Sequence, residues 1–123
     1  RFGTTYSHIQ IGQEIAIEEG EMPNALKIVI YRITQETLNN VIKHSKADHV
    51  SFSLKTASRK IELTITDNGK GFDVDEILTQ EKSRPGLGLI SMKERTRLLG
   101  GSFSIISAEG RGTSIHASWP ILS

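Results

Sequence analysis

The run Ile61-Glu62-Leu63-Thr64-Ile65-Thr66 is the feature that most constrains how this chain folds. Apolar and polar side chains alternate in it, and this period of two predicts a strand with one buried face. The segment Asp67-Asn68-Gly69-Lys70-Gly71 follows at once. One interpretation is a surface turn, because Asn-Gly is a common hairpin turn. The other is a ligand contact, because glycines let a backbone approach a flat ligand closely, and a carboxylate at a strand end accepts a hydrogen bond from an amine.

Length and charge narrow the class of protein. The chain has 123 residues, a net charge of +1 and no cysteine. This length suits one domain, residues 1–123, with a sizeable core. The near-neutral charge gives no reason to expect a nucleic-acid or anionic-membrane surface. Without cysteine there is no disulfide framework, no thiolate metal site and no thiol nucleophile. The sequence shows no membrane span and no signal peptide.

Four more strands are predicted around the first one. Their alternating apolar positions are Ile9, Ile11, Ile15 and Ile17; Val50, Phe52 and Leu54; Phe103 and Ile105; and Ile115, Ala117 and Trp119. The strand around residue 52 should form a hairpin with the strand at 60–66. Pro120 stops the last strand, and Trp119 is expected in the core rather than in a ligand site.

A long helix is predicted from Asn24, which can cap it, to about Lys46. One apolar stripe at helical spacing consists of Leu26, Ile30, Ile33, Thr37, Val41 and His44. Four polar residues lie beside that stripe, namely Arg32, Glu36, Asn40 and Lys43. They predict either a solvated face that carries an ion pair or the wall of a cleft, since they sit at the edge of the buried stripe.

Residues 72–84 are acidic at first and polar later, and they predict a mobile loop with room for one helical turn. The segment Pro85-Gly86-Leu87-Gly88-Leu89 ends this loop and begins a second helix through Leu99, which Gly100-Gly101 terminates. A flexible Gly-x-Gly that opens a helix predicts a phosphate site, because free backbone N–H groups and the helix dipole point at an anion. The alternative is that these glycines only turn the chain.

The order of these elements resembles a known family. Residues 33–44, with the sequence ITQETLNNVIKH, look like the N box of histidine-kinase ATP-binding domains. Residues 67–72 resemble their first glycine box, residues 86–95 the second glycine box with its helix, and residues 110–113 the final Gly-Thr element. The resemblance covers about residues 8–120 and is to the GHKL ATPase superfamily, which includes gyrase, heat-shock chaperones and mismatch-repair ATPases. The Gly-x-x-x-x-Gly-Lys-Ser/Thr motif of P-loop proteins is absent.

The resemblance implies a role for each matching residue. Asp67 would accept from the adenine amino group, Gly69 and Gly71 would let the strand end lie against the base, and Thr113 would support Asp67 through water. Asn40 would bind Mg²⁺ through its amide oxygen, which suits a hard cation. Glu36 would act as a base or orient the attacking group, and Lys43 would sit near the phosphates. The residues that would border the triphosphate are Gly86, Leu87 and Gly88. The resemblance leaves the role of His44 open. Its place in the apolar stripe predicts a packed core histidine.

The implied fold is a two-layer α/β sandwich of the Bergerat type, with a mixed, largely antiparallel sheet and helices on one face. Within the superfamily, the Gln-Glu start of the N box, the Lys-His pair and the short 72–85 interval look most like the sensor histidine kinases that pair with helix-turn-helix response regulators. This resemblance implies a cytoplasmic location, as the cytoplasmic part of a bacterial sensor kinase. The implied function is transfer of the γ-phosphate of ATP-Mg²⁺ to a histidine in two-component signalling. Alternatives are an anti-sigma-factor-type serine kinase, a GHKL ATP-operated clamp, and a nucleotide-binding module without activity.

The phospho-acceptor histidine of such kinases is followed by an acidic residue. The four histidines here are followed by Ile9, Ser45, Val50 and Ala117. None of them fits, and the chain begins with Arg1 rather than Met. We therefore expect a fragment, monomeric on its own, whose partners are the dimerisation and phospho-acceptor domain of the same kinase and a downstream response regulator. Contact of this fragment with nucleic acid or a membrane is not expected.

Overall fold

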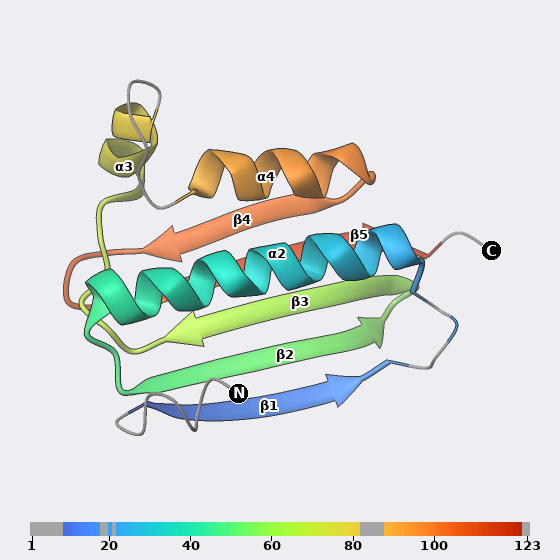
Figure 1. The fold of residues 1–123 in the computed structure, drawn as a ribbon, viewed down its shortest axis with the longest axis horizontal. Coiled ribbons are helices and arrows are strands. Elements are labelled where there is room, and N and C mark those ends of the chain that lie inside the picture. Colours follow the sequence, from blue (N-terminus) through green and yellow to red (C-terminus); the bar gives the residue numbers. More distant parts are fainter. Residues whose placement is uncertain (1–8, 18–19, 21, 82–87, 122–123) are drawn as a thin grey trace.

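A five-stranded sheet and the helices on one of its faces make up the fold (Figure 1). The computed structural model describes residues 9–17, 20, 22–81 and 88–121. The elements are β1 (Gln10–Ala16), α2 (Asn24–Asn40), the π-helical turn η1 (Val41–Ser45), β2 (His49–Ala57), β3 (Lys60–Asp67), α3 (Val74–Glu81), α4 (Leu89–Leu98), β4 (Ser102–Ser107) and β5 (Thr113–Pro120). The strands predicted from alternation are all present.

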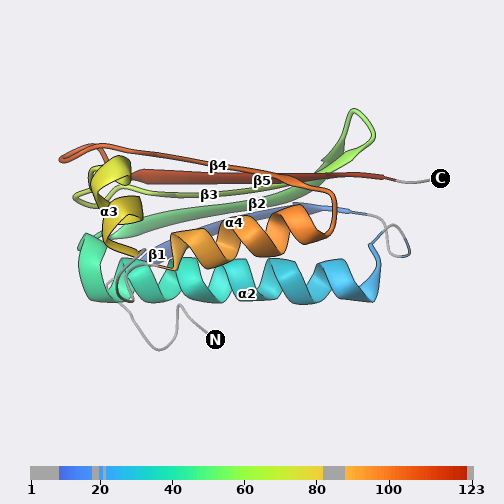
Figure 2. The same cartoon turned by 90° about the horizontal axis from the view of Figure 1, so that it is seen from above.

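The sheet has the strand order β1-β2-β3-β5-β4. β1 pairs with β2 in parallel, and the other three pairs are antiparallel. Ser58 and Arg59 join β2 to β3 with positive φ angles of 53° and 63°, which a tight hairpin turn between twisted strands requires. Figure 2 shows α2 and α4 on the same side of the sheet. The predicted two-layer α/β sandwich with a largely antiparallel sheet is therefore confirmed.

Helix α2 lies against the sheet through the predicted apolar stripe, of which Leu26, Ile30, Ile33, Thr37 and Val41 are buried. Its start differs from the prediction, because Pro23 is the N-cap and Asn24 is already helical. No side chain caps the helix; instead, the Pro23 carbonyl accepts from the N–H groups of Leu26 and Lys27. At the other end the helix changes to the π turn η1, which ends where Lys46 adopts a left-handed conformation, with φ at 57°.

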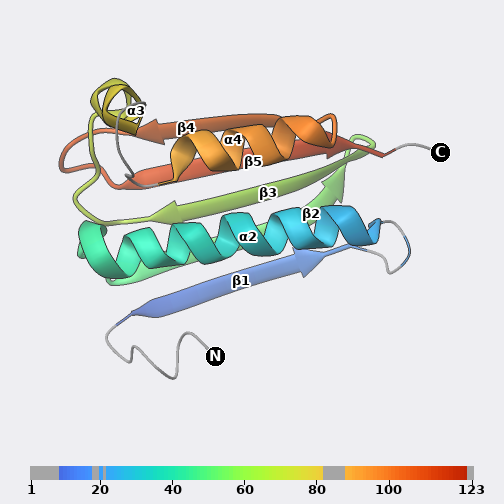
Figure 3. The same cartoon turned by 45° about the horizontal axis from the view of Figure 1, so that its top comes forward.

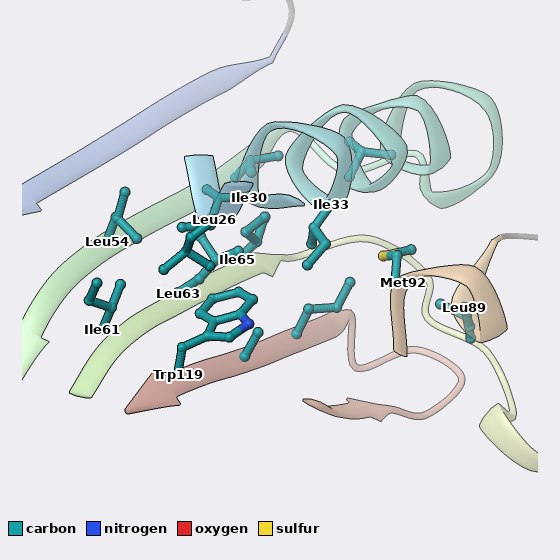
Figure 4. Close-up of a cluster of buried hydrophobic side chains, with 14 of the residues drawn as sticks. Leu26, Ile30, Ile33, Leu54, Ile61, Leu63, Ile65, Leu89, Met92 and Trp119 are labelled. Atoms are coloured by element: carbon teal, nitrogen blue, oxygen red, sulfur yellow. The ribbon is translucent and has the colours of Figure 1, made fainter. Parts of the chain in front are cut away.

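The core fills the space between the two helices and the central strands (Figure 4). Leu63 and Ile65 from β3 meet Ile33 from α2 and Met92 from α4 in this layer. Trp119 is 2% exposed, so its predicted place in the core is confirmed. α4 runs beside β4 and β5, as Figures 1 and 3 both show, and this packing sets where its first turn lies relative to α2.

Two expectations fail at the periphery. Ile15 has the parity of the buried residues, yet it is 61% exposed, because β1 is an edge strand that the helices cover only in part. Residues 72–84 hold the eight-residue helix α3 instead of a loop with one turn. The Asp73 carboxylate accepts from the N–H of Glu76 at 3.0 Å, and Ile77 and Leu78 pack against the core, so this segment has both a cap and an apolar face.

Candidate functional site

A cleft of about 480 Å³ opens at the end of the sheet where β3 finishes and β5 begins. Figure 1 shows the end of α2, helix α3 and the start of α4 at this same end. The cleft is lined by Thr37, Asn40, Val41, Asp67, Lys70, Gly71, Phe72, Asp73, Glu76, Ile77, Leu89, Ile105, Glu109, Gly110, Thr113 and Ile115. Residues far apart in the sequence, including four predicted site residues, therefore share one cavity wall.

Asp67 is the last residue of β3 and is only 8% exposed. Its Oδ1 accepts from the N–H of Gly69 at 2.8 Å, and its carboxylate also accepts from the N–H of Thr113. Burial raises the pKa of Asp67 above its ordinary value of 3.8, although the two N–H groups act in the opposite direction. The side chain is a buried acceptor at the cleft, whose charge is incompletely compensated by its backbone partners.

Two glycines permit the close backbone packing around Asp67. Gly71 has φ at +65°, and a Cβ there would lie 2.0 Å from the Ala108 carbonyl oxygen. Gly112 has φ at +74°, and a Cβ there would lie 2.2 Å from the Asp67 carbonyl oxygen. No side chain fits at either position without moving the backbone of its neighbour. The turn between β4 and β5 thus lies directly against the segment after β3.

Ser107, the last residue of β4, joins the elements of this wall. Its hydroxyl oxygen accepts from the N–H of Phe72 at 2.9 Å and lies 3.0 Å from the carbonyl oxygen of Gly112. It also bonds the hydroxyl of Thr113 at 2.8 Å. Sequence reasoning missed Ser107. Its signal was a serine at the inward parity of Phe103 and Ile105, where an apolar residue would continue the strand.

Asn68 makes a second connection that sequence reasoning missed. Its Oδ1 accepts from the N–H groups of Asp48 and His49 at 3.1 and 3.0 Å, and its Nδ2 donates to the Asp48 carboxylate at 2.7 Å. Hydrogen bonds from His49 first and from Asn68 second lower the pKa of Asp48. These contacts fix the segment after Asp67 to the start of β2, which explains why Asn-Gly does not form a hairpin turn here.

The helical side of the site is less enclosed. Asn40, the last residue of α2, is half-buried and lines the cleft. Glu36 is also half-buried and packs on Gly88, whose added Cβ would lie 2.7 Å from the Glu36 Oε1 atom. Lys43 lies on η1, is exposed and is not among the residues that line the cleft. In a π turn successive side chains are spaced differently from an α-helix, so the α-helical spacing that linked Lys43 to Asn40 does not hold.

Part of the predicted phosphate segment can be placed. Gly88 is the N-cap of α4 with φ at 75°, and its carbonyl accepts from the N–H of Met92 at 3.0 Å. Leu89, the next residue, lines the cleft. Gly86 and Leu87 lie outside the described residues, as does the side chain of His44. The structure thus brings Asn40, Asp67, Gly71 and Thr113 to the cleft wall and sets Glu36 against the start of α4.

Residues 25–123 match the family described as histidine kinase-, DNA gyrase B- and HSP90-like ATPases. The chain belongs to this family. Over 109 residues it is 39% identical to the sensor histidine kinase LiaS of Bacillus subtilis, covering 89% of this chain and 28% of that protein. Over 106 residues it is 40% identical to the signal transduction histidine-protein kinase/phosphatase DegS of Brevibacillus brevis, covering 85% of this chain and 26% of that protein.

Solved structures agree on the fold of this ATPase family member. The histidine kinase domain of the blue-light activated histidine kinase EL346 from Erythrobacter litoralis matches with a TM-score of 0.73, over 98% of this chain and 56% of that chain. The histidine kinase AdeS of Acinetobacter baumannii matches with a TM-score of 0.71, over 99% of this chain and 60% of that chain. Both are 18% identical to this chain, so they support the fold alone.

The chain spans about a quarter of the length of the curated relatives named above. Within the described residues, no helix is long and apolar enough to cross a membrane. The same residues contain no group of three or more His, Cys, Asp or Glu side chains placed to hold a metal ion.

Proposed function

We propose that this chain is the catalytic unit of a longer sensor histidine kinase. It binds ATP with Mg²⁺ and transfers the γ-phosphate to a histidine on a dimerisation domain of the same kinase. The observation that carries the proposal is Asp67, a buried carboxylate at the end of β3, which lines the same cleft as Asn40 on α2. Under this proposal, the hydrogen-bond acceptor for the base and the oxygen ligand for the cation belong to residues that line one cavity.

At the β-sheet end, the cleft suits a flat base with an amino group. Gly71 and Gly112 let the turn between β4 and β5 pack against the segment after β3, and Gly69 holds one Asp67 oxygen through its N–H. The carboxylate oxygens keep lone pairs beyond those that the two backbone donors use. An amine that donates to this carboxylate would compensate a charge that burial disfavours, and this supports Asp67 as the residue that binds the adenine amino group.

At the helical end, the residues fit a hard cation and a triphosphate. Asn40 lines the cleft and its amide oxygen is the proposed protein ligand, since Mg²⁺ typically takes one or two protein oxygens while phosphate oxygens and water complete its coordination. When bound, the ion would neutralise charge on the phosphates. As the resemblance implies, Gly86, Leu87 and Gly88 would border the triphosphate, and the exposed Lys43 on η1 would lie near the phosphates.

Glu36 is the candidate base or orienting residue. Its side chain packs on Gly88, so its carboxylate stands at the first turn of α4, next to the segment proposed to hold the phosphates. A carboxylate there can accept the proton of an attacking imidazole or fix its orientation. Phosphoryl transfer needs mainly positioning and charge neutralisation, which the proposed arrangement supplies with few residues.

The names of the relatives support the rest of the proposal. LiaS and DegS are both histidine kinases, and the matched region is a small part of each. The acceptor histidine would lie on the dimerisation domain, the phosphate would pass to a response regulator, and the unit would work in the cytoplasm. The serine kinase, the clamp and the inactive binding module have no specific observation in their favour.

Two measurements test the proposal. Calorimetric titration of the chain with a non-hydrolysable ATP analogue should give one site whose affinity rises when Mg²⁺ is added. Mixed with the dimerisation domain of a LiaS-type kinase and ATP, the chain should produce acid-labile phosphohistidine on that domain. Absence of nucleotide binding would overturn the whole proposal, whereas binding without transfer would leave the inactive binding module as the better conclusion.

A further inference from the structure

The Ser107 hydroxyl has three polar neighbours and one hydrogen to donate. It accepts from the Phe72 N–H and lies within hydrogen-bond distance of the Gly112 carbonyl oxygen and of the Thr113 hydroxyl. A serine hydroxyl carries one donor and two acceptor lone pairs. The bond to Phe72 uses one lone pair. The hydrogen must then go either to the Gly112 carbonyl or to Thr113.

Counting partners distinguishes the two arrangements. If Ser107 donates to the Gly112 carbonyl, Thr113 donates its own hydrogen to Ser107. The Phe72 N–H, the Gly112 carbonyl and both hydroxyl hydrogens then all have a partner. If Ser107 donates to Thr113 instead, the Gly112 carbonyl loses this donor, and the Thr113 hydrogen needs another acceptor. Gly112 is buried and Thr113 is 8% exposed, so leaving groups unsatisfied there is unfavourable. The first arrangement is the one that the structure favours.

This arrangement fixes what Thr113 shows to the cleft. With its hydrogen directed at Ser107, the Thr113 oxygen has only lone pairs left for a ligand or a water molecule. The neighbouring Asp67 carboxylate is also an acceptor, and both residues line the same cleft. Two acceptors side by side match the donors of an amino group and oppose a carbonyl oxygen, whose lone pairs would face theirs.

We propose that Ser107 determines base specificity by holding the Thr113 hydroxyl as an acceptor, so that the cleft selects 6-amino over 6-oxo purines. This inference rests on the proposed nucleotide-binding function. Ser107 is a positioning residue, because it acts through Thr113 and through the backbone of Phe72 and Gly112. Its removal frees the Thr113 hydroxyl to rotate and to donate to a carbonyl oxygen.

The test compares non-hydrolysable analogues of ATP and ITP, which differ at position 6 of the purine and in the N1 proton that accompanies the change. The quantity measured is the ratio of their two affinities in the chain and its variants. Ser107→Ala should lower the preference for the ATP analogue, that is, its affinity divided by that of the ITP analogue, about tenfold, as expected for one misdirected hydrogen bond. Ser107→Thr, which keeps the hydroxyl, should show the same affinity ratio as the unmodified chain. Ser104→Ala is the matched control, because Ser104 lies on the same strand but is exposed.

The possible outcomes separate the inference from the proposed function. If the unmodified chain binds neither analogue, the proposed function fails. If the chain binds the ATP analogue but Ser107→Ala weakens both analogues equally, Ser107 has only a structural role and the inference is wrong. In the background of Thr113→Val, Ser107→Ala should leave the ratio unchanged, and a further fall there would also contradict the inference. Should Ser107→Ala fail to fold, Ser107→Cys carries the same expectation with a smaller change.

Discussion

The two ends of the cleft are built differently. At the sheet end, Asp67, Ser107 and Thr113 are strand-terminal residues whose polar atoms bond one another or the adjoining backbone. At the helical end, Asn40 lines the cleft, while Glu36 on α2 and Lys43 on η1 lie outside its lining, and all three side chains are half-buried or exposed. The polar groups of the sheet end are thus held by hydrogen bonds to neighbouring strands and backbone, whereas the side chains of the proposed helical end are more exposed. Binding specificity should reside in the first end and reactivity in the second.

The largest effect is expected where the sheet end is most tightly packed. Gly112→Ala places a Cβ 2.2 Å from the Asp67 carbonyl oxygen at a positive φ, and should lower the free energy of unfolding by on the order of 3 kcal/mol. Gly100→Ala is the control, because Gly100 has a φ of +78° but no heavy atom within 4 Å of an added Cβ. Gly100→Ala should lower the free energy of unfolding by only about 1 kcal/mol. Urea unfolding gives both values, and equal losses would show that the packing at Gly112 is loose.

Glu36→Gln should act on reactivity alone. The substitution keeps the shape that packs on Gly88 but removes basicity, so phosphotransfer to the added acceptor domain should slow by about 100-fold or more. The affinity for the ATP analogue should stay the same, and this serves as the internal control. Single-turnover measurement of phosphohistidine formation checks the prediction, and a wild-type rate would exclude Glu36 as the base.

Asp67→Asn should weaken nucleotide binding without lowering the stability of the fold. The amide oxygen can still accept from the Gly69 N–H, but an amide presents a donor where the adenine amine needs an acceptor, so affinity should fall roughly 10- to 100-fold. Folding should not suffer at pH 7, because the substitution removes a charge that burial disfavours. Calorimetry and thermal unfolding measure the two effects. A variant that binds normally would remove Asp67 from the site.

Asn40→Ala tests the helical end. If the amide oxygen binds Mg²⁺, its loss should weaken analogue binding about tenfold in Mg²⁺ and leave binding in EDTA nearly unchanged. The measurement is a pair of titrations with and without the metal. An equal loss in both conditions would mean that Asn40 contacts the nucleotide or supports the cleft wall rather than the ion.

The smallest effect near neutral pH concerns protonation of Asp67. Its pKa in the folded chain is raised by burial, so ionised Asp67 lowers stability, and this penalty is relieved as the pH falls through the folded pKa towards 3.8. An amine that bonds the carboxylate favours the ionised form. Nucleotide affinity should therefore weaken with falling pH, starting above the range of an ordinary aspartate, by up to about tenfold per pH unit. Asp67→Asn should lose this dependence, and an unchanged profile in that variant would assign it to another group.

Periodicity was enough to predict the sheet and the helix stripe, because burial dictates residue type at each of those positions. Of the polar residues predicted beside that stripe as a cleft wall, only Asn40 lines the cleft. Asp67 was found because a charged residue stands at the end of an apolar alternation. Ser107 and the Asn68 contacts were missed because their meaning depends on strands that meet only in the fold. The helix α3 was missed because its apolar face is short and its acidic residues were interpreted as a loop rather than as a favourable N-terminus. The assigned roles of the site residues stay predictions.

The parallel pairing of β1 has a consequence for the order of folding. β2 and β3 are joined by a two-residue turn and can pair early, whereas β1 must wait for the crossover through α2 before it meets β2. β1 is also an edge strand, exposed along most of its length, and contributes no residue to the cleft. It should therefore add last and open first. Local opening of this strand would leave the cleft intact, so the strand should be able to open while the proposed nucleotide site stays assembled.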